Sequence, residues 1–159
     1  MNRTLAWVSA TILLAGCATT APASHPNGPT CDGSAEANRN VVIAFYNEGL
    51  VGLQPRSAFE RYMTTDFVEH KPDVPEGTRE AAADFLEELI KSVPQARWEV
   101  VRTIAEGDMV FLHGRFTPAV GAPAYAIADV FRLESCKIAE HWDVVAAPPM
   151  EQRNPNSRF

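Results

Sequence analysis

The chain has 159 residues, of which 46% are hydrophobic, and its 20 acidic side chains outnumber 14 basic ones, so the net charge is −6. This length suits one domain with a full-sized hydrophobic core. An acidic chain without a basic patch or a polybasic stretch is not built to bind nucleic acid or anionic lipid by charge. We therefore expect no nucleic-acid partner, and membrane contact only through an anchor.

Residues 1–16 have the order of a secretory signal peptide. A basic start precedes an apolar run over residues 5–15, and small residues then lead to Cys17. The run is too short to span a bilayer as a permanent helix. Residues 14–17, Leu-Ala-Gly-Cys, resemble the bacterial lipobox, in which the cysteine is lipidated and becomes the new N-terminus; an ordinary signal peptide is the alternative. Ala18 after the cysteine then implies an exported, lipid-anchored protein of the outer membrane, facing the periplasm.

A tether and a second cysteine follow the anchor. Within the segment 17–33, small, polar and proline-rich residues cannot bury a core and are typical of a flexible tether. Besides Cys17 the chain has two cysteines, Cys31 and Cys136, and an even pair in an oxidising compartment predicts a disulfide. Two free buried thiols are the alternative.

Three helices are expected in the first half of the domain. Ser34 is a good N-cap for the first helix, and Pro55 suits the first turn of the second. Thr78 caps the third helix, which ends before Pro94. Residues 67–70, between the second and third helices, are expected to be extended. The first helix has one apolar stripe at helical spacing, formed by Val42, Phe45, Tyr46, Gly49 and Leu50.

The second half of the chain alternates between apolar and polar residues, as strands do. The alternation predicts four strands, over residues 97–105, 109–117, 124–133 and 137–146. Short turns separate the first from the second and the third from the fourth, so these pairs are expected to form hairpins. Helices followed by a run of antiparallel strands indicate an α+β fold.

Asp129 is the strongest candidate for acid–base chemistry. It shares a face of its strand with the bulky side chains of Tyr125, Ile127, Phe131 and Leu133. A buried carboxylate is costly unless it is paired, hydrogen-bonded or raised in pKa, and such a group is a candidate general acid or base. A structural aspartate paired with a buried arginine or with backbone amides is the alternative.

His113 lies on the preceding strand, where the ladder could bring it to Asp129. An imidazole beside a carboxylate is a recurring proton-transfer pair, whereas a lone histidine on an apolar face is usually a satisfied core residue. Further along, alternation puts Glu140 and Trp142 on one face of the last strand, and His141 and Asp143 on the other. Either face can line a pocket, because one bulge reverses the alternation.

The histidines are also candidate metal ligands. His70 precedes a proline-rich loop and could lie at the mouth of a cavity. Three imidazoles, from His70, His113 and His141, would suffice for zinc, but their wide separation has no ligand-spacing logic. We therefore expect no metal. Hydrolysis by a serine triad is disfavoured too, because no nucleophile-elbow motif is present.

Several segments, weak singly but specific together, resemble the SnoaL-like polyketide cyclase family. They are Phe45-Tyr46-Asn47, Phe67-Val68-Glu69-His70-Lys71-Pro72, Ile104-Ala105-Glu106-Gly107-Asp108, Asp129-Val130-Phe131-Arg132 and Lys137-Ile138-Ala139-Glu140-His141-Trp142-Asp143-Val144. The resemblance extends from about residue 36 to the last residues of the chain. It implies an NTF2-like cone, in which three N-terminal helices pack on a curved, mainly antiparallel sheet and enclose an apolar pocket. We expect the domain over residues 34–147 and a C-terminal tail over residues 148–159.

The resemblance also implies a reaction. Characterised cyclases of this family close a polyketide ring by intramolecular aldol condensation, without a metal or an organic cofactor. Their catalytic carboxylate resembles Asp129 and an associated histidine resembles His113, so Asp129 would remove a proton next to a carbonyl while a pocket donor stabilises the enolate. Further pocket candidates are His70, Tyr46, Trp98, Tyr125, His141, Trp142 and Asp143.

The expected partner is a small apolar or carbonyl-containing molecule. A homodimer through the open face of the sheet is a further expectation from the family. The same cone hosts proteins that only bind ligands, and polyketide assembly is cytoplasmic whereas this chain has an export signal. A non-catalytic ligand-binding lipoprotein of the cell envelope is therefore the alternative function.

Overall fold

A computed structural model describes residues 32–159. The proposed signal peptide, Cys17, most of the tether and Cys31 lie outside the described residues. The helices are α1 (Ala35–Tyr46), α2 (Pro55–Tyr62) and α3 (Arg79–Ser92), with a π-helical turn, η1 (Asn47–Val51), after α1 and a 3₁₀ turn, η2 (Pro75–Gly77), before α3. The strands are β1 (Met63–Glu69), β2 (Arg97–Glu106), β3 (Met109–Thr117), β4 (Tyr125–Glu134) and β5 (Lys137–Ala146).

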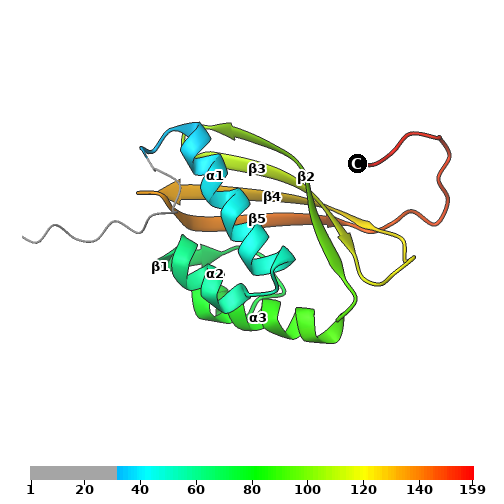
Figure 1. Ribbon diagram of the computed structural model, residues 1–159, viewed down its shortest axis with the longest axis horizontal. Helices are drawn as coiled ribbons and strands as arrows, with labels where there is room; N and C mark the ends of the chain where they lie inside the picture. The colour runs from blue at the N-terminus through cyan, green and yellow to red at the C-terminus, as the bar shows by residue number, and fades with distance from the viewer. Residues whose placement is uncertain (1–31) are drawn as a thin grey trace, which may run out of the picture.

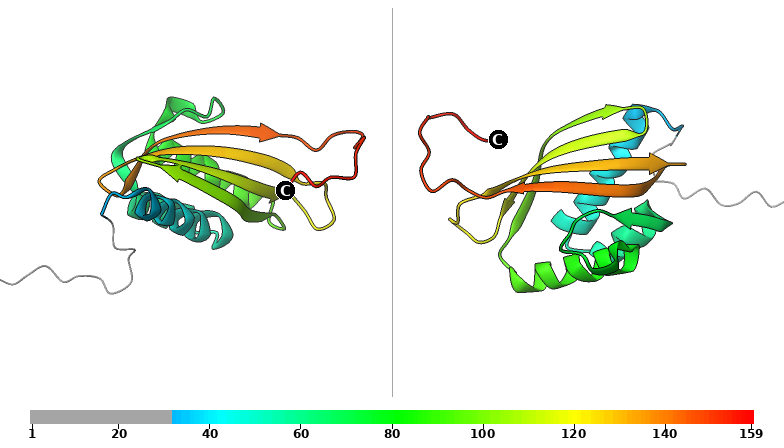
Figure 2. Two further views of the ribbon diagram at one scale, coloured as in Figure 1. Left: turned by 90° about the horizontal axis from the view of Figure 1, so that it is seen from above. Right: turned by 180° about the vertical axis from the view of Figure 1, so that it is seen from behind.

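The five strands form one curved sheet, which the helices cover on a single side (Figure 1). The strand order is β1-β5-β4-β3-β2; β1 runs parallel to β5, and the other pairs are antiparallel. Within residues 32–159, no helix lies on the back of the sheet (Figure 2). This arrangement confirms the predicted α+β fold, with three helices on a mainly antiparallel sheet.

Local sequence signals set the helix starts as expected. The Ser34 hydroxyl accepts a hydrogen bond from the backbone N–H of Ala37 at 3.2 Å, and the Thr78 hydroxyl accepts one from that of Ala81 at 3.3 Å. Pro55 occupies the first turn of α2. No helix within residues 32–159 combines the length and the apolar character needed to cross a membrane.

Two features of the first half differ from the sequence-based expectation. The chain continues from α1 into the π-helical turn η1, where the backbone N–H of Gly52 donates to the carbonyl of Asn47 at 2.7 Å. β1 begins at Met63 rather than near Phe67, because only its two ends pair with β5 and the register shifts between them. Apolar alternation therefore revealed only the last part of this strand.

The core lies between the helices and the inner face of the sheet. The predicted stripe of α1 is buried in it, and Phe45 links the layers by edge-on contacts with Phe59 of α2 and Phe131 of β4, at ring-centroid distances of 5.3 and 6.3 Å. Edge-to-face aromatic pairs at this spacing add to the stabilisation from burial alone. The other large core residues include Leu112, Ile138 and Val110.

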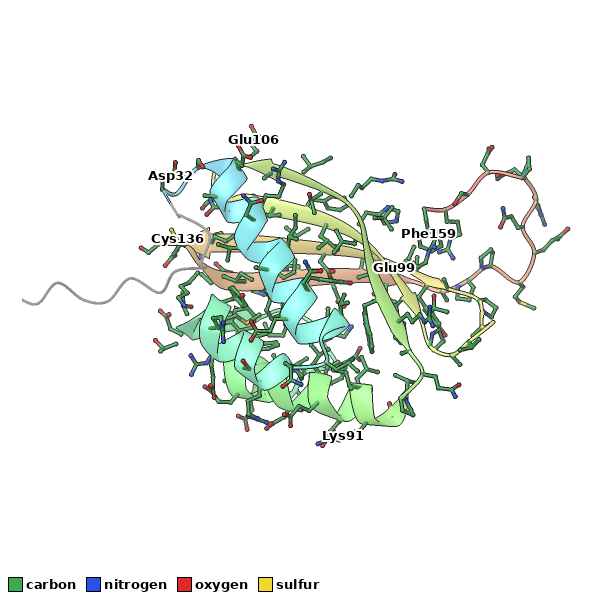
Figure 3. All side chains as sticks on the ribbon, viewed as in Figure 1. Asp32, Lys91, Glu99, Glu106, Cys136 and Phe159 are labelled. Carbon is green, nitrogen blue, oxygen red and sulfur yellow. The ribbon has the colours of Figure 1, made fainter. Side chains whose placement is uncertain are left out.

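Tight turns close the two predicted hairpins. Gly107 between β2 and β3 has a φ of +57°, a conformation that glycine adopts without strain. Ser135 and Cys136 between β4 and β5 both have positive φ, as the type I′ turn of a two-residue hairpin requires. Cys136 thus lies at the tip of a hairpin, at the same end of the molecule as Asp32 (Figure 3).

Candidate functional site

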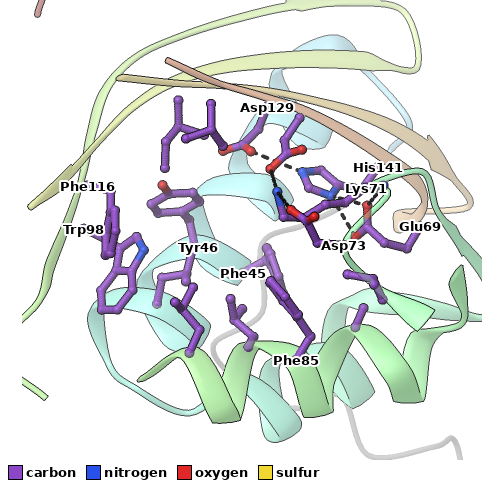
Figure 4. A pocket seen from close by; sticks show the side chains of 18 of the residues that line it. Phe45, Tyr46, Glu69, Lys71, Asp73, Phe85, Trp98, Phe116, Asp129 and His141 are labelled. Atoms are coloured by element: carbon purple, nitrogen blue, oxygen red, sulfur yellow. Dashed lines mark hydrogen bonds and ion pairs between the residues drawn. The ribbon is translucent and has the colours of Figure 1, made fainter. Parts of the chain in front are cut away.

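A cavity of about 300 Å³ lies between the helices and the inner face of the sheet (Figure 4). Most of its wall is apolar, with side chains from all three helices and from the sheet. This size and character are typical of a site for a small ligand. The polar groups on the wall are those of Tyr46, Glu69, Lys71, Asp73, Tyr125, Asp129, His141 and Asp143.

The register between β3 and β4 points Asp129 into this cavity. Asp129 pairs with Leu112, and Leu112 is fully buried, so both side chains are on the inner face. Asp129 itself is only 6% exposed. The carboxylate therefore lies on the wall of an apolar pocket.

The same register corrects the expectation for His113. It pairs with Ala128, one residue away from the Leu112–Asp129 pair, so its side chain lies on the opposite face of the sheet and does not meet Asp129. There its ring stacks on that of Phe159 at 5.9 Å. Burial, with the nearby charges of Arg102 and Arg158, lowers the pKa of His113. His113 belongs to the outer face, where the tail returns to the sheet.

A bulge in β5 decides which histidine faces Asp129. Arg132 pairs with Glu140 and Leu133 pairs with Ile138, so Ala139 is an extra residue in β5. Ile138 points into the core before the bulge, and His141 points into the cavity after it. Strict alternation would have put these two residues on opposite faces.

His141 joins carboxylates from two other strands. Its Nε2 is 3.2 Å from Oδ1 of Asp129, and its Nδ1 is 2.9 Å from Oε2 and 3.0 Å from Oε1 of Glu69. The ring also stacks on that of Phe131 at 4.7 Å. Figure 4 shows the three polar side chains converging at one end of the cavity. We call Glu69, His141 and Asp129 the carboxylate–histidine chain.

The charges within the carboxylate–histidine chain depend on one another. Burial by itself disfavours the imidazolium, but the hydrogen bonds to Asp129 and Glu69 outweigh it and raise the pKa of His141 to about 10. Burial raises the pKa of Asp129 above its usual range, although the hydrogen bond from His141 opposes this. At neutral pH the ring is thus a cation between two acidic groups, and Asp129 is a stronger base than an exposed aspartate.

Sequence reasoning missed Glu69. It is the last residue of β1, it pairs with His141, and it is 9% exposed. Its Oε1 also accepts a hydrogen bond from the backbone N–H of Lys71 at 2.9 Å, which connects the loop after β1 to the carboxylate–histidine chain. Glu69 alternates with the buried Phe67, and that spacing already indicated an inward carboxylate.

Lys71 provides a second ion pair on the cavity wall. Its Nζ lies 2.8 Å from Oδ2 of Asp143 on β5 and 3.4 Å from Oδ2 of Asp73. The pKa of Lys71 is raised because the contacts with Asp143 and Asp73 outweigh the effect of burial. Because Glu69 pairs with His141, this ion pair continues the contact between β1 and β5 and fastens the loop after β1 to β5.

The other pocket candidates divide between the two faces. Tyr46, Trp98, Tyr125 and Asp143 line the cavity, together with Asp129 and His141. His70 and Trp142 do not, which corrects the expectation for both.

Trp142 points to the outer face because it alternates with His141 along β5. The ring of His70 stacks on that of Trp142 at 4.4 Å, and its Nε2 lies 2.9 Å from Glu140. The three histidines that were candidate zinc ligands, His70, His113 and His141, therefore do not lie together. Within residues 32–159, no group of three or more His, Cys, Asp or Glu side chains is arranged to hold a metal ion.

Comparison with solved structures identifies the fold. A loop truncation variant of IdmH is 18% identical, with a TM-score of 0.58, and the match covers 68% of this chain and 91% of that one. A candidate polyketide cyclase from Acidithiobacillus ferrooxidans is 17% identical (TM-score 0.58; 69% and 87% covered). An NTF2-like protein of unknown function from Cytophaga hutchinsonii is 18% identical (TM-score 0.55; 68% and 88% covered). At these identities the likeness is one of fold, and the fold is NTF2-like.

The sequence itself identifies the family. The family model of the SnoaL-like domain matches residues 42–141, which is more than half of the chain. This protein therefore belongs to the SnoaL-like domain family. The match contains all three members of the carboxylate–histidine chain. The comparison with curated proteins finds no match.

Proposed function

We propose that this protein binds a small, largely apolar carbonyl compound in the cavity and removes a proton from the carbon next to the carbonyl. Asp129 is the general base. One observation supports this most strongly: His141 occupies Oδ1 of Asp129, while no side chain or backbone group among the described residues donates to Oδ2. A carboxylate that is oriented through one oxygen and unoccupied at the other, on a cavity wall, is suited to take a proton.

The proposed step needs no further reagent. The proton moves from carbon to Oδ2 of Asp129, the C–H electron pair forms the C=C bond of an enolate, and the carbonyl π pair moves to oxygen. In an aldol-type ring closure, the enolate carbon then attacks a second carbonyl of the same molecule, the π pair of that carbonyl moves to its oxygen, and the resulting alkoxide takes the proton back from Asp129. In an isomerisation, Asp129 returns the proton to another carbon of the ligand. His141 stays protonated and holds the Asp129 carboxylate in place, while Glu69 fixes the orientation of the ring.

Deuterium exchange into a simple ketone tests this proposal. We expect the protein to accelerate exchange of the C2 protons of 1-tetralone in D₂O, and Asp129→Asn to lower this rate at least about 100-fold, as expected when a general base is lost. Asp66→Asn is the matched control, because Asp66 is an exposed aspartate on β1. Exchange that is equal in the wild type and in Asp129→Asn would rule out Asp129 as the base.

The alternative function is ligand binding without turnover. The mostly apolar wall of the cavity supports it, because such a wall holds an apolar ligand whether or not a proton moves. This alternative is favoured if 1-tetralone binds and its exchange does not exceed the buffer rate. A lipophilic molecule that co-purifies with such an inactive protein would identify the ligand class.

We also propose that the protein is exported and anchored through lipid on Cys17 in the outer membrane, facing the periplasm. The lipobox-like sequence before Cys17 supports this location. Mass spectrometry of the protein purified from membranes should find an acylated Cys17 as the N-terminus, and Cys17→Ser should release the protein from the membrane fraction. An unmodified chain that keeps residues 1–16 would contradict the proposal.

A disulfide between Cys31 and Cys136 fits the same compartment. Cys136 is at the tip of the β4–β5 hairpin, and Asp32, the neighbour of Cys31, lies at the same end of the molecule (Figure 3). Such a bond would close a long loop and stabilise the fold chiefly by restricting the unfolded chain. Peptide mapping without reducing agent should recover the two cysteines in one linked pair; two free thiols would refute it.

The outer face of the sheet supports a proposed homodimer. An apolar row lies on the outer face of the sheet, which none of the described helices covers. It is formed across four strands by Ile104, Phe111, Val130 and Trp142. Ile104 in this row is 65% exposed. Light scattering should give twice the mass of one chain, and a monomer at all concentrations would exclude the dimer.

A further inference from the structure

Tyr46 presents an unpaired hydroxyl inside the cavity. The residue is only 2% exposed, it lines the cavity, and no described residue hydrogen bonds to its hydroxyl. The hydroxyl oxygen is not among the fully buried atoms that lack a partner, so it faces the cavity. Phenylalanine would fill the same space in the wall without this polar group. The hydroxyl of Tyr46 is therefore unexplained by packing.

The sheet leaves room for this hydroxyl at Gly114. A Cβ atom at position 114 would lie 2.8 Å from the hydroxyl oxygen of Tyr46, closer than real Cβ contacts allow. Gly114 is in the middle of β3, and its φ is not positive, so its backbone conformation does not require glycine. Glycine in a strand often marks a close approach by another group. Here that group is the end of the Tyr46 side chain.

Tyr46 is also near the proposed base. Burial, together with the negative charge of Asp129, raises the pKa of Tyr46, so the hydroxyl keeps its proton and can only be a donor to an oxygen ligand. The two side chains do not hydrogen bond to each other. Figure 4 shows both at the wall of the same cavity. A ligand that reaches both would meet a hydrogen-bond donor and a proton acceptor.

We propose that Tyr46 donates a hydrogen bond to the carbonyl oxygen of the ligand, and that Gly114 keeps open the space that this hydroxyl needs. The ligand class is accordingly ketones with an apolar body, bound with the carbonyl oxygen at Tyr46 and the adjacent C–H at Oδ2 of Asp129. The identity of the group as a carbonyl rests on the proposed function. The same hydrogen bond stabilises the enolate oxygen when the proton leaves.

A matched pair of probes tests this subsite. 1-Tetralone and tetralin share a ring system, and only the ketone can accept a hydrogen bond. We expect Tyr46→Phe to weaken 1-tetralone binding about 5- to 10-fold, the ratio for one neutral hydrogen bond, and to change tetralin binding less than about twofold. Equilibrium dialysis measures both affinities. Tyr62→Phe is the control and should leave both affinities unchanged, because Tyr62 is a tyrosine at the end of α2 that does not line the cavity.

Gly114→Ala provides a second route to the same answer. The added methyl group displaces the hydroxyl of Tyr46, so this variant should lose ketone affinity selectively although the tyrosine remains. If Tyr46→Phe does not fold, Gly114→Ala still tests whether the hydroxyl of Tyr46 binds the ketone. If Tyr46→Phe weakens the binding of 1-tetralone and tetralin equally, the proposal is overturned, because Tyr46 then only shapes the cavity. Unchanged affinity of Tyr46→Phe for 1-tetralone, or an equal selective loss in Tyr62→Phe, would overturn it as well.

The subsite and the proposed catalysis can fail separately. A selective loss of ketone affinity in Tyr46→Phe, with no exchange by the wild type, supports the subsite and rejects the reaction. Exchange that depends on Asp129 but not on Tyr46, with unchanged affinities, supports the reaction and rejects the subsite.

Discussion

His141 donates to two carboxylates from two other strands, and this contact explains how both can be buried. Glu69 and Asp129 are 9% and 6% exposed, and an imidazolium between them compensates part of the cost of their burial. The arrangement also leaves one oxygen of Asp129 open to the cavity. Stability and the proposed chemistry thus depend on the same side chain.

Replacement of His141 tests this role at the residue scale. His141→Gln removes the cation and leaves the two carboxylates uncompensated, so we expect the free energy of unfolding to fall by about 3–5 kcal/mol. Urea denaturation measures the loss. His70→Gln is the control, because His70 is on the outer face with its side chain 37% exposed, and it should cost less than about 1 kcal/mol. Equal effects of the two substitutions would contradict a buried imidazolium.

Part of the candidate site could be predicted from residue patterns. Asp129 was identified because it shares a strand face with bulky apolar residues, and this alternation holds along β4. The expected contact between His113 and Asp129 is wrong, because it depends on a register that a single sequence does not determine. His141 could not be placed for a related reason: the extra residue Ala139 reverses the alternation of β5.

At the scale of elements, the best predictions came from local chemistry. Ser34 and Thr78 cap their helices, and Gly107 forms the hairpin turn, because each depends only on its neighbours in the chain. The start of β1 and the bulge of β5 depend instead on the partner strand. Non-local pairing is therefore where the expectations and the structure differ.

The turn after β1 gives a testable link between an element and the site. Gly77 has a φ of +62°, and a Cβ there would lie 2.7 Å from the carbonyl oxygen of Glu69. Gly77→Ala should therefore displace the end of β1 and lower the free energy of unfolding by about 2 kcal/mol or more. Gly107→Ala is the matched control, because Gly107 has a similar φ of +57° and nothing within 4 Å of the added Cβ.

Denaturation curves of the two variants separate backbone strain from collision. Both should lose the roughly 1 kcal/mol expected for alanine at positive φ, and only Gly77→Ala should lose more. If Gly107→Ala is as damaging as Gly77→Ala, then Glu69 is not constrained by this turn.

At the scale of the whole molecule, the fold places the carboxylate–histidine chain at one end of a mostly apolar cavity. The helices close one side, the curved sheet closes the other, and the Lys71–Asp143 pair fastens the loop after β1 to β5. An apolar interior raises the pKa of Asp129, and the same interior would hold an apolar ligand against it. The NTF2-like fold thus supplies the enclosure, and β1, β4 and β5 supply the three members of the carboxylate–histidine chain.

The global stability should depend on pH through His141. The pKa of its ring is raised from 6.5 to about 10, so below about pH 6.5 both the folded and the unfolded chain are protonated there and its contribution is complete. Between these values the folded protein keeps a proton that the unfolded chain has released, so the free energy of unfolding falls as pH rises. Thermal melts from pH 6 to 10 should show a progressive loss, which is absent in His141→Gln. A stability that is level across this window would contradict the assigned charge.

The protonation of His141 itself is the most direct test of the account. Nuclear magnetic resonance of ¹⁵N-labelled histidine side chains in the wild type follows each ring through a pH titration. We expect both ring nitrogens of His141 to remain protonated at pH 8 and to titrate only near pH 10, because Asp129 and Glu69 hold the ring as a cation. A ring that titrates at or below 6.5 would contradict the carboxylate–histidine chain, and with it the assignment of Asp129 as an oriented base.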